Sequence, residues 1–133
     1  HAPHSEEHKD CEWQAAAFGM LGLETSLSVV IKTMIESKLI DWSQLVDRMS
    51  VRPAQIAGYK TQGQEIKEGS TANLLLLDPN SNWQVDRNKM KSKSRNTPFQ
   101  GMTLPGVITD VIYNGNFSMK SGNVMSMNSG NNG

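Results

Sequence analysis

The stretch VITDVIYNG, residues 107–115, decides the fold class of the second half of this chain. β-branched and aromatic side chains dominate positions 107–113, and such residues favour a β-strand. Asn114-Gly115 follows directly, and this dipeptide favours a type I′ hairpin turn because both central residues need positive φ. The stretch therefore predicts a strand over 107–113 and a return strand over 116–119.

Two further strand candidates lie upstream of this hairpin. Residues 72–77 form a continuous apolar run closed by an Asp-Pro pair, which is typical of a buried strand. Residues 83–86 form a second, shorter candidate. The stretch KSKSRNTPFQG, residues 91–101, is polar and rich in turn residues, with Phe99 as its lone apolar anchor.

The clearest helix candidate is ETSLSVVIKTMIE, residues 24–36. Its apolar residues recur at i, i+3, i+4, i+7 and i+8, which places them on one face of an amphipathic helix. β-branched residues lower the intrinsic helix propensity, so tertiary burial must hold this helix. The apolar stripe consists of Leu27, Val30, Ile31, Met34 and Ile35.

Two further helix signals follow the apolar stripe. Asp41 is a favourable N-cap residue, and Gln44 three residues later suits the partner position of a capping box. Ser50 is a second N-cap candidate, because Pro53 is tolerated in the first turn of a short helix. Gly58 supplies the C-terminal stop of that short helix.

The hydrophobic period changes from helix to strand after residue 59. Helices followed by strands indicate two structural parts rather than one interleaved α/β domain. The parts are residues 1–58 and 59–120. The remaining stretch SGNVMSMNSGNNG, residues 121–133, has almost nothing to bury and should be disordered.

Composition narrows the class of protein. The 133 residues suffice for one ordinary domain. Lys plus Arg equals Asp plus Glu, 13 against 13, so charge gives no reason to expect nucleic acid or an anionic membrane as partner. One cysteine forms no internal disulfide, no apolar run approaches the roughly 20 residues of a membrane span, and no signal-peptide pattern is present. We therefore expect a soluble cytoplasmic protein.

The chain opens with HAPHSEEHKDC, in which three histidines precede a cysteine. His1, His4, His8 and Cys11 are residue types that bind zinc. Pro3 restricts the local backbone, however, and the spacing matches none of the usual structural-zinc patterns. An ordinary solvated polar loop is the alternative interpretation of these residues.

Several motifs stand in order along the chain: HAPHSEEHK (1–9), AAFGMLGLETSLSVV (16–30), RPAQIAGY (52–59), GQEIKEGSTANLLLLDP (63–79) and SKSRNTPFQGMTLPGVITDVIYNG (92–115). In this order and spacing they resemble the C-terminal part of a dihydroorotase of the amidohydrolase superfamily. The resemblance runs from His1 to about Met119. Each motif is short, but the ordered set is quite specific.

The resemblance implies an α/β fold class, namely the C-terminal end of a (β/α)8 TIM barrel plus part of the small amidohydrolase β-sandwich domain. Residues 1–58 would supply the last loop and helices of the metal-dependent hydrolase barrel, and residues 59–120 the small β-domain. In the family, the Asp that ends barrel strand eight would directly precede His1. We therefore expect a C-terminal fragment that lacks the barrel.

The resemblance also implies a zinc-dependent hydrolase that reversibly cyclises N-carbamoyl-L-aspartate to L-dihydroorotate in de novo pyrimidine biosynthesis. Its zinc ligands are expected upstream, so this chain would hold neither a metal ligand nor the catalytic Asp. His4 matches the histidine that helps to bind the substrate carboxylate. Phe18 and Gly19 match the pair whose backbone groups contact the pyrimidine-like ring. We therefore expect His4, Phe18 and Gly19 to bind substrate.

The remaining polar residues of the opening loop have structural interpretations. His1 is expected to support the loop, and His8 and Cys11 to be structural or solvated. Asn73 departs from the family, which usually has Asp in this Ala-Asp-Leu stretch. Because Asn73 lies in the β-domain, the departure casts little doubt on the chemistry.

Other residues of the family pattern have local explanations. Glu24 and Thr25 fit the pattern, but a helix N-terminus explains them equally well, with Glu favouring the helix dipole and Thr capping. Asn96, Thr97 and Pro98 also match, and we interpret them as a turn before a strand.

Two rival functions stay open. One is another cyclic-amide hydrolase, allantoinase-like or hydantoinase-like, although HAPH followed by FG and GLET favours dihydroorotase. The other is a non-catalytic, dihydroorotase-like structural partner of a carbamoyltransferase. The partners implied are the small-molecule substrate and either a second copy in a homodimer or a carbamoyltransferase.

The apolar stripe of residues 24–36 should pack on barrel strands that this chain lacks. Burying one such side chain contributes about 1.5–3 kcal/mol, against a typical total stability of roughly 5–15 kcal/mol. We therefore expect the isolated 133-residue chain to be inactive as a dihydroorotase. We also expect it to be marginally folded or to associate through the stripe.

Overall fold

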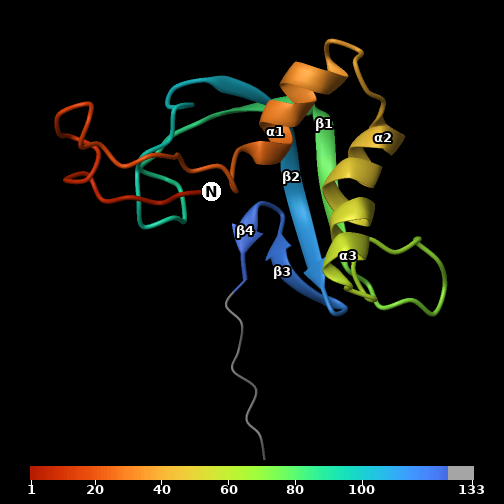
Figure 1. Ribbon diagram of the computed structural model, residues 1–133. Helices are drawn as coiled ribbons and strands as arrows, with labels where there is room; N and C mark the ends of the chain where they lie inside the picture. Colours follow the sequence, from red (N-terminus) through yellow and green to blue (C-terminus); the bar gives the residue numbers. More distant parts are fainter. Residues whose placement is uncertain (126–133) are drawn as a thin grey trace, which may run out of the picture.

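A four-stranded antiparallel sheet forms the centre of the computed structural model, which describes residues 1–125 (Figure 1). The strands are ordered β1-β2-β3-β4, so neighbours in sequence are neighbours in the sheet. β1 (Leu74–Gln84) and β2 (Thr103–Tyr113) form the longest pairing. β3 (Asn116–Lys120) and the short β4 (Asn123–Val124) extend the sheet on the other side of β2.

β1 joins the two upstream strand candidates into one irregular strand. Its pairing with β2 is interrupted between Asp78 and Asn82, and Pro79 lies in this bulge, where no ladder N–H is needed. The Asp78 carboxylate accepts hydrogen bonds from Asn80 N at 2.9 Å and from the Ser81 hydroxyl, which holds the bulge together. The prediction that the Asp-Pro pair closes the strand was therefore wrong.

The hairpin predicted between β2 and β3 is confirmed. Asn114 and Gly115 have φ values of 48° and 78°, as a turn with two left-handed central residues requires. A second turn of the same kind at Ser121 and Gly122, with φ values of 48° and 78°, connects β3 to β4. This strand begins inside the stretch that we expected to be disordered, and residues 126–133 of that stretch lie outside the described residues.

The two predicted helical regions are present. Helix α1 (Ser26–Val30) continues into a π-helical turn, η1 (Ile31–Ile35). The second region runs without a break through helix α2 (Trp42–Val46), the π-helical turn η2 (Asp47–Val51) and helix α3 (Arg52–Ala57). Within residues 1–125, no helix is long and apolar enough to cross a membrane.

The ends of the second helical region follow local sequence signals. The Asp41 carboxylate accepts from Gln44 N at 2.8 Å, and Asp41 N donates to Gln44 Oε1 at 3.0 Å, so the predicted capping box is confirmed. Gly58 ends α3 with a φ of 72°, also as predicted. Ser50 is not an N-cap, because it lies inside η2 and the backbone stays helical into α3.

Helix α1 and its continuation η1 lie against the β1–β2 hairpin (Figure 1). Ile31 is buried there and packs over Gly106. A Cβ atom at Gly106 would lie only 2.7 Å from Ile31 Cδ1 and 3.2 Å from Leu77 Cδ1. Only glycine leaves that space free. The buried Ser28 hydroxyl donates to Gly106 O at 3.2 Å and accepts from Trp83 Nε1 at 3.0 Å. A polar bond and an apolar contact thus fix α1 at the β1 bulge.

The apolar stripe is therefore covered in part by this chain itself. The expectation that it packs only on strands outside the chain was wrong for Ile31, which is 2% exposed. The other four stripe residues are half-buried. The leucine run of β1 is also less buried than predicted, since Leu75 and Leu76 are 49% and 45% exposed.

A small hydrophobic core joins the start of β2 to the N-terminal part of the chain. Val85 and Leu104 are fully buried in it, and Phe99 packs against it, which confirms Phe99 as the anchor of its polar segment. The core includes Leu21, two residues after Gly19 of the predicted substrate-binding pair. The cluster consists of Leu21, Val85, Met90 and Leu104, with Val29, Trp83 and Phe99 packed around it.

Candidate functional site

The N-terminal loop, residues 1–24, lies beside the β1–β2 connection, residues 85–102 (Figure 1). The loop has turns but no helix or strand, as expected for its first 22 residues. It folds back on itself, because Ala2 N donates to Met20 O at 2.8 Å. This return brings the two ends of the loop, which carry the predicted site residues, side by side.

His1 supports this return, as the sequence predicted. Its Nδ1 accepts hydrogen bonds from Gly22 N at 3.1 Å and Leu23 N at 3.3 Å. These two backbone N–H groups precede α1, so His1 ties the start of the chain to the approach to the first helix. A ring nitrogen that accepts two N–H groups is not free to bind another donor.

The structure brings the three predicted substrate-binding residues together. His4 Nε2 lies 2.7 Å from Phe18 O, and because a carbonyl only accepts, this nitrogen carries the proton. Gly19 has a φ of 101°, and a Cβ atom there would collide with Ala2 and lie 3.9 Å from His4 Nε2. The Phe18 side chain is 94% exposed, so the residue contributes its backbone, not its ring, to the group.

Two residues that sequence reasoning missed hold this group. Lys9 Nζ donates to Ala17 O at 2.7 Å and to Gly19 O at 3.0 Å. Asn96, interpreted only as a turn residue, accepts from His4 N through Oδ1 at 3.2 Å. Nothing local to Lys9 signals its role, whereas the place of Asn96 in the family motif was a signal that the turn interpretation set aside.

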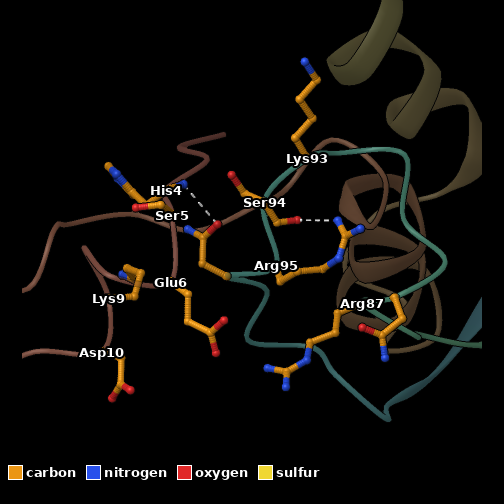
Figure 2. A pocket seen from close by; sticks show the side chains of 11 residues that line it. His4, Ser5, Glu6, Lys9, Asp10, Arg87, Lys93, Ser94 and Arg95 are labelled. Atoms are coloured by element: carbon orange, nitrogen blue, oxygen red, sulfur yellow. Dashed lines mark hydrogen bonds between the residues drawn. The ribbon is translucent and has the colours of Figure 1, made fainter.

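An open hollow of about 700 Å³ separates the N-terminal loop from the β1–β2 connection (Figure 2). His4 and Asn96 line it, but Phe18 and Gly19 do not. Figure 2 shows loop side chains on one side of the hollow and side chains of the connection on the other. Its charged lining is Lys9, Arg87, Lys93 and Arg95 against Glu6 and Asp10, so cationic groups outnumber anionic ones.

No metal cluster forms from the residues that the structure describes: no three His, Cys, Asp or Glu side chains are placed to hold an ion. His1 and His4 are each hydrogen-bonded to backbone atoms through a ring nitrogen. His8 is exposed, and exposed Cys11 directs its Sγ to His8 O at 3.7 Å. These residues therefore do not fit the zinc interpretation of the opening loop.

Glu24 and Thr25 do not act as a helix N-terminus would require. Thr25 precedes α1, but its side chain makes no capping bond to the helix. The Glu24 carboxylate accepts from Lys91 N at 2.9 Å and Ser92 N at 3.0 Å, in the β1–β2 connection. The local explanation of these residues was therefore wrong, because Glu24 binds a segment 67 residues away.

Comparison of sequences identifies relatives of this chain. It is 48% identical to a dihydroorotase of Streptomyces coelicolor over 122 residues, 92% of the chain and 28% of the relative. The chain is similar to a segment of dihydroorotases. A dihydroorotase of Mycobacterium tuberculosis is 41% identical over 124 residues, 93% of the chain and 29% of the relative. No model of a protein family matches.

These matches confirm the dihydroorotase resemblance inferred from the motifs. The chain spans less than a third of the length of the dihydroorotases that it matches. Extensive identity over nine-tenths of this chain is consistent with a segment of a larger dihydroorotase.

Solved structures that are similar to the chain include hydantoinases. A D-hydantoinase (dihydropyrimidinase) from Thermus sp. superposes with a TM-score of 0.83 at 21% identity, covering 94% of this chain and 28% of that one. An L-hydantoinase (dihydropyrimidinase) from Arthrobacter aurescens has a TM-score of 0.76 at 31% identity, over 84% of this chain and 25% of that one. The α/β arrangement of helices and antiparallel sheet is thus shared with these proteins.

Proposed function

We propose that this chain is the C-terminal part of a zinc-dependent dihydroorotase that interconverts N-carbamoyl-L-aspartate and L-dihydroorotate. The observation that carries the proposal is the grouping of His4, Phe18 and Gly19 in a chain with up to 48% identity to dihydroorotases. In this proposal, residues 1–58 complete a (β/α)8 barrel and residues 59–120 belong to its small β-domain. The described sheet is consistent with the second part.

His4 is the residue proposed to bind the substrate carboxylate. Its Nε2 is engaged with Phe18 O, so Nδ1 is the ring nitrogen left for a ligand. A protonated imidazole donates through both nitrogens, so His4 could hold Phe18 and a carboxylate at the same time. The cationic excess in the hollow beside His4 favours an anionic substrate.

Phe18 and Gly19 are proposed to present backbone groups to the cyclic imide of dihydroorotate. Main-chain N–H and C=O groups suit such a ring because it carries both donors and acceptors. The φ of 101° at Gly19 allows a backbone course that few other residues adopt. A ligand could therefore approach this backbone closely.

Zinc, in this proposal, is held by residues outside the chain, as the resemblance to dihydroorotases implies. When bound, it would supply a metal-activated hydroxide for attack on the ring amide. The contribution of this chain is then to bind and orient the substrate, not to hold the metal. Substitutions here should act mainly on the KM for substrate.

The decisive experiment uses the full open reading frame that contains residues 1–133. The protein would be assayed for zinc-dependent interconversion of carbamoyl aspartate and dihydroorotate, with the isolated 133-residue chain expected to be inactive. His4→Ala should raise the KM at least about tenfold, because a carboxylate partner is lost. His8→Ala is the matched control, since His8 is an exposed histidine of the same loop, and it should leave the KM unchanged.

Loss of zinc by chelation should abolish activity, and re-addition should restore it. An intact full-length protein that converts neither substrate would overturn the proposal. Turnover of hydantoins instead would support a hydantoinase-like hydrolase, which the 31% identity to the L-hydantoinase favours as the second candidate. Inertness with all three substrates, together with co-purification with a carbamoyltransferase, would indicate the non-catalytic partner.

A further inference from the structure

We propose that Asn96 is the positioning residue of this site, which holds His4 and the Phe18-Gly19 backbone in one fixed arrangement. The inference rests on the proposed function, since it concerns the same substrate-binding group. Its basis is a set of hydrogen bonds that a single side chain makes to both ends of the N-terminal loop. No other described side chain makes bonds to both ends in this way.

Both halves of the Asn96 amide are engaged. Oδ1 accepts from His4 N at 3.2 Å, and Nδ2 donates to Ala2 O at 2.8 Å. Nδ2 also lies 3.5 Å from Gly19 O, on the opposite branch of the loop. The backbone carbonyl of Asn96 accepts from Leu21 N at 3.2 Å. One residue thus contacts the branch that carries His4 and the branch that carries Gly19.

This pattern requires an amide at position 96. An aspartate keeps the acceptor for His4 N but has no donor for Ala2 O, and an aliphatic side chain offers neither. The Asn96 side chain is part-buried, so carbonyl and N–H groups left without a partner would lose stabilisation. The bonds of Asn96 therefore specify the geometry of the loop.

The segment that carries Asn96 is itself held in place. Phe99 packs on the hydrophobic core three residues later, and Arg95 Nη1 donates to Ser94 O at 2.9 Å just before. Glu24 binds the start of the same segment through Lys91 N. Residues 5–15 of the N-terminal loop are exposed except for half-buried Lys9, so few packing contacts fix the loop between its two ends. Asn96 joins these ends to the anchored segment.

A residue that acts in this way should affect substrate binding more than the chemical step. In the proposed function His4 binds the substrate carboxylate and does not touch the reacting amide. A displaced His4 therefore weakens binding in the ground state and transition state alike, which raises KM and leaves kcat nearly unchanged. A residue that only stabilised the fold would lower the amount of active enzyme and leave KM as it is.

Asn73 supplies a matched control. Its amide also joins two backbone segments, with Nδ2 donating to Thr61 O at 2.9 Å and Oδ1 accepting from Asn114 N at 2.9 Å. It lies at the far end of the β1–β2 pair, beside the Asn114 turn, and takes no part in the site. Asn73→Ala and Asn96→Ala therefore remove the same kind of side chain from two places.

The test compares these variants in the full-length enzyme. Asn96→Ala should raise the KM for dihydroorotate about tenfold with kcat within about twofold of wild type, and Asn73→Ala should change neither. Asn96→Asp keeps the volume and the acceptor, so it tests the same split if Asn96→Ala fails to fold. Equal KM values for wild type and both Asn96 variants would overturn the inference.

Amide hydrogen exchange supplies a readout that does not depend on activity. Asn96→Ala removes the acceptor of His4 N, so exchange at residues 2–5 should accelerate, while Asn73→Ala leaves it unchanged. If the wild-type protein were inert toward dihydroorotate, the proposed function would fail, and this exchange would still decide whether Asn96 holds the loop. Unchanged exchange at residues 2–5 in Asn96→Ala would overturn the inference.

Discussion

Helix α1 lies on the sheet through buried side chains. The N-terminal loop, apart from Leu21 in the hydrophobic core, is joined to the β1–β2 connection through hydrogen bonds to main-chain atoms. At the helix, Ile31 fills the space over Gly106 that any Cβ atom would occupy. At the loop, Glu24 and Asn96 bind backbone N–H and C=O groups while most loop side chains stay exposed. The two regions share one chain but depend on different interactions.

The difference separates stability from site geometry. Buried apolar contacts are lost only with much of the fold, so changes at the helix should act on global unfolding. Polar contacts at a partly exposed loop contribute less to global stability but decide where His4 lies. Substitutions in the two regions should therefore give different signatures, and the size of the effect should fall from the helix to the loop.

The largest effect is expected at Gly106. Gly106→Ala places a Cβ atom 2.7 Å from Ile31 Cδ1 and imposes a φ of 82° on a non-glycine residue. The two costs together should lower the free energy of unfolding by about 3 kcal/mol, as measured by urea unfolding of the full-length protein. Gly101→Ala is the matched control, because Gly101 has a φ of 76° with open space around it, and it should cost about 1 kcal/mol.

Equal losses of unfolding free energy in Gly106→Ala and Gly101→Ala would contradict the role given to the Ile31 contact. They would mean that the positive φ accounts for the whole cost and that Ile31 moves aside freely. If the extra loss of unfolding free energy in Gly106→Ala disappears in an Ile31→Val background, the loss comes from the steric contact with Ile31 Cδ1.

A smaller and more local effect is expected at Glu24. Glu24→Ala removes the acceptor of Lys91 N and Ser92 N, so amide exchange at those two residues should accelerate roughly fivefold, which corresponds to about 1 kcal/mol. Global unfolding should change less than in Gly106→Ala. Glu12→Ala removes an exposed glutamate of the same loop and should leave that exchange unchanged. A global loss as large as that of Gly106→Ala would contradict the division between the regions.

The smallest effect is expected in the stability of the protein at low pH, through the carboxylate of Asp110. The Thr109 hydroxyl, the Ser121 N–H and the charge of Lys120 hold the pKa of Asp110 below its ordinary value. A lowered pKa means that the ionised form stabilises the folded state at neutral pH and that this contribution is lost as the pH falls below about 4. Asp110→Asn should therefore make the midpoint temperature of unfolding fall less steeply as the pH decreases from about one unit above the ordinary pKa of roughly 4 to about two units below it. An unchanged slope would show that Asp110 does not contribute.

Much of the local structure could be predicted, because its signals lie within a few residues. The capping box needs only Asp41 and Gln44, and the β2–β3 turn needs only Asn114 and Gly115. The family motif assigned His4, Phe18 and Gly19 to substrate binding, and that role stays a prediction, although the structure places His4 Nε2 2.7 Å from Phe18 O. Short-range patterns were thus sufficient for the capping box and the turn.

The errors share a different physical origin. Glu24 and Asn96 were given local explanations, yet their partners lie 67 and 94 residues away. The strand end predicted at Pro79 was wrong because a bulge against β2 accommodates a residue without an N–H. Each of these outcomes depends on which distant backbone group comes within reach, and no neighbouring residue encodes that.

By itself, the sequence determined the helical stripe, the Asn114-Gly115 turn and the resemblance to dihydroorotases, because each depends on residue type and spacing alone. Only the tertiary structure decided that Gly106 admits Ile31, that β1 runs through its bulge, and that Asn96 joins His4 to Gly19. The residue type of a polar side chain fixes which hydrogen-bond donors and acceptors it has. Its partners are chosen only when packing brings a distant backbone within hydrogen-bond distance.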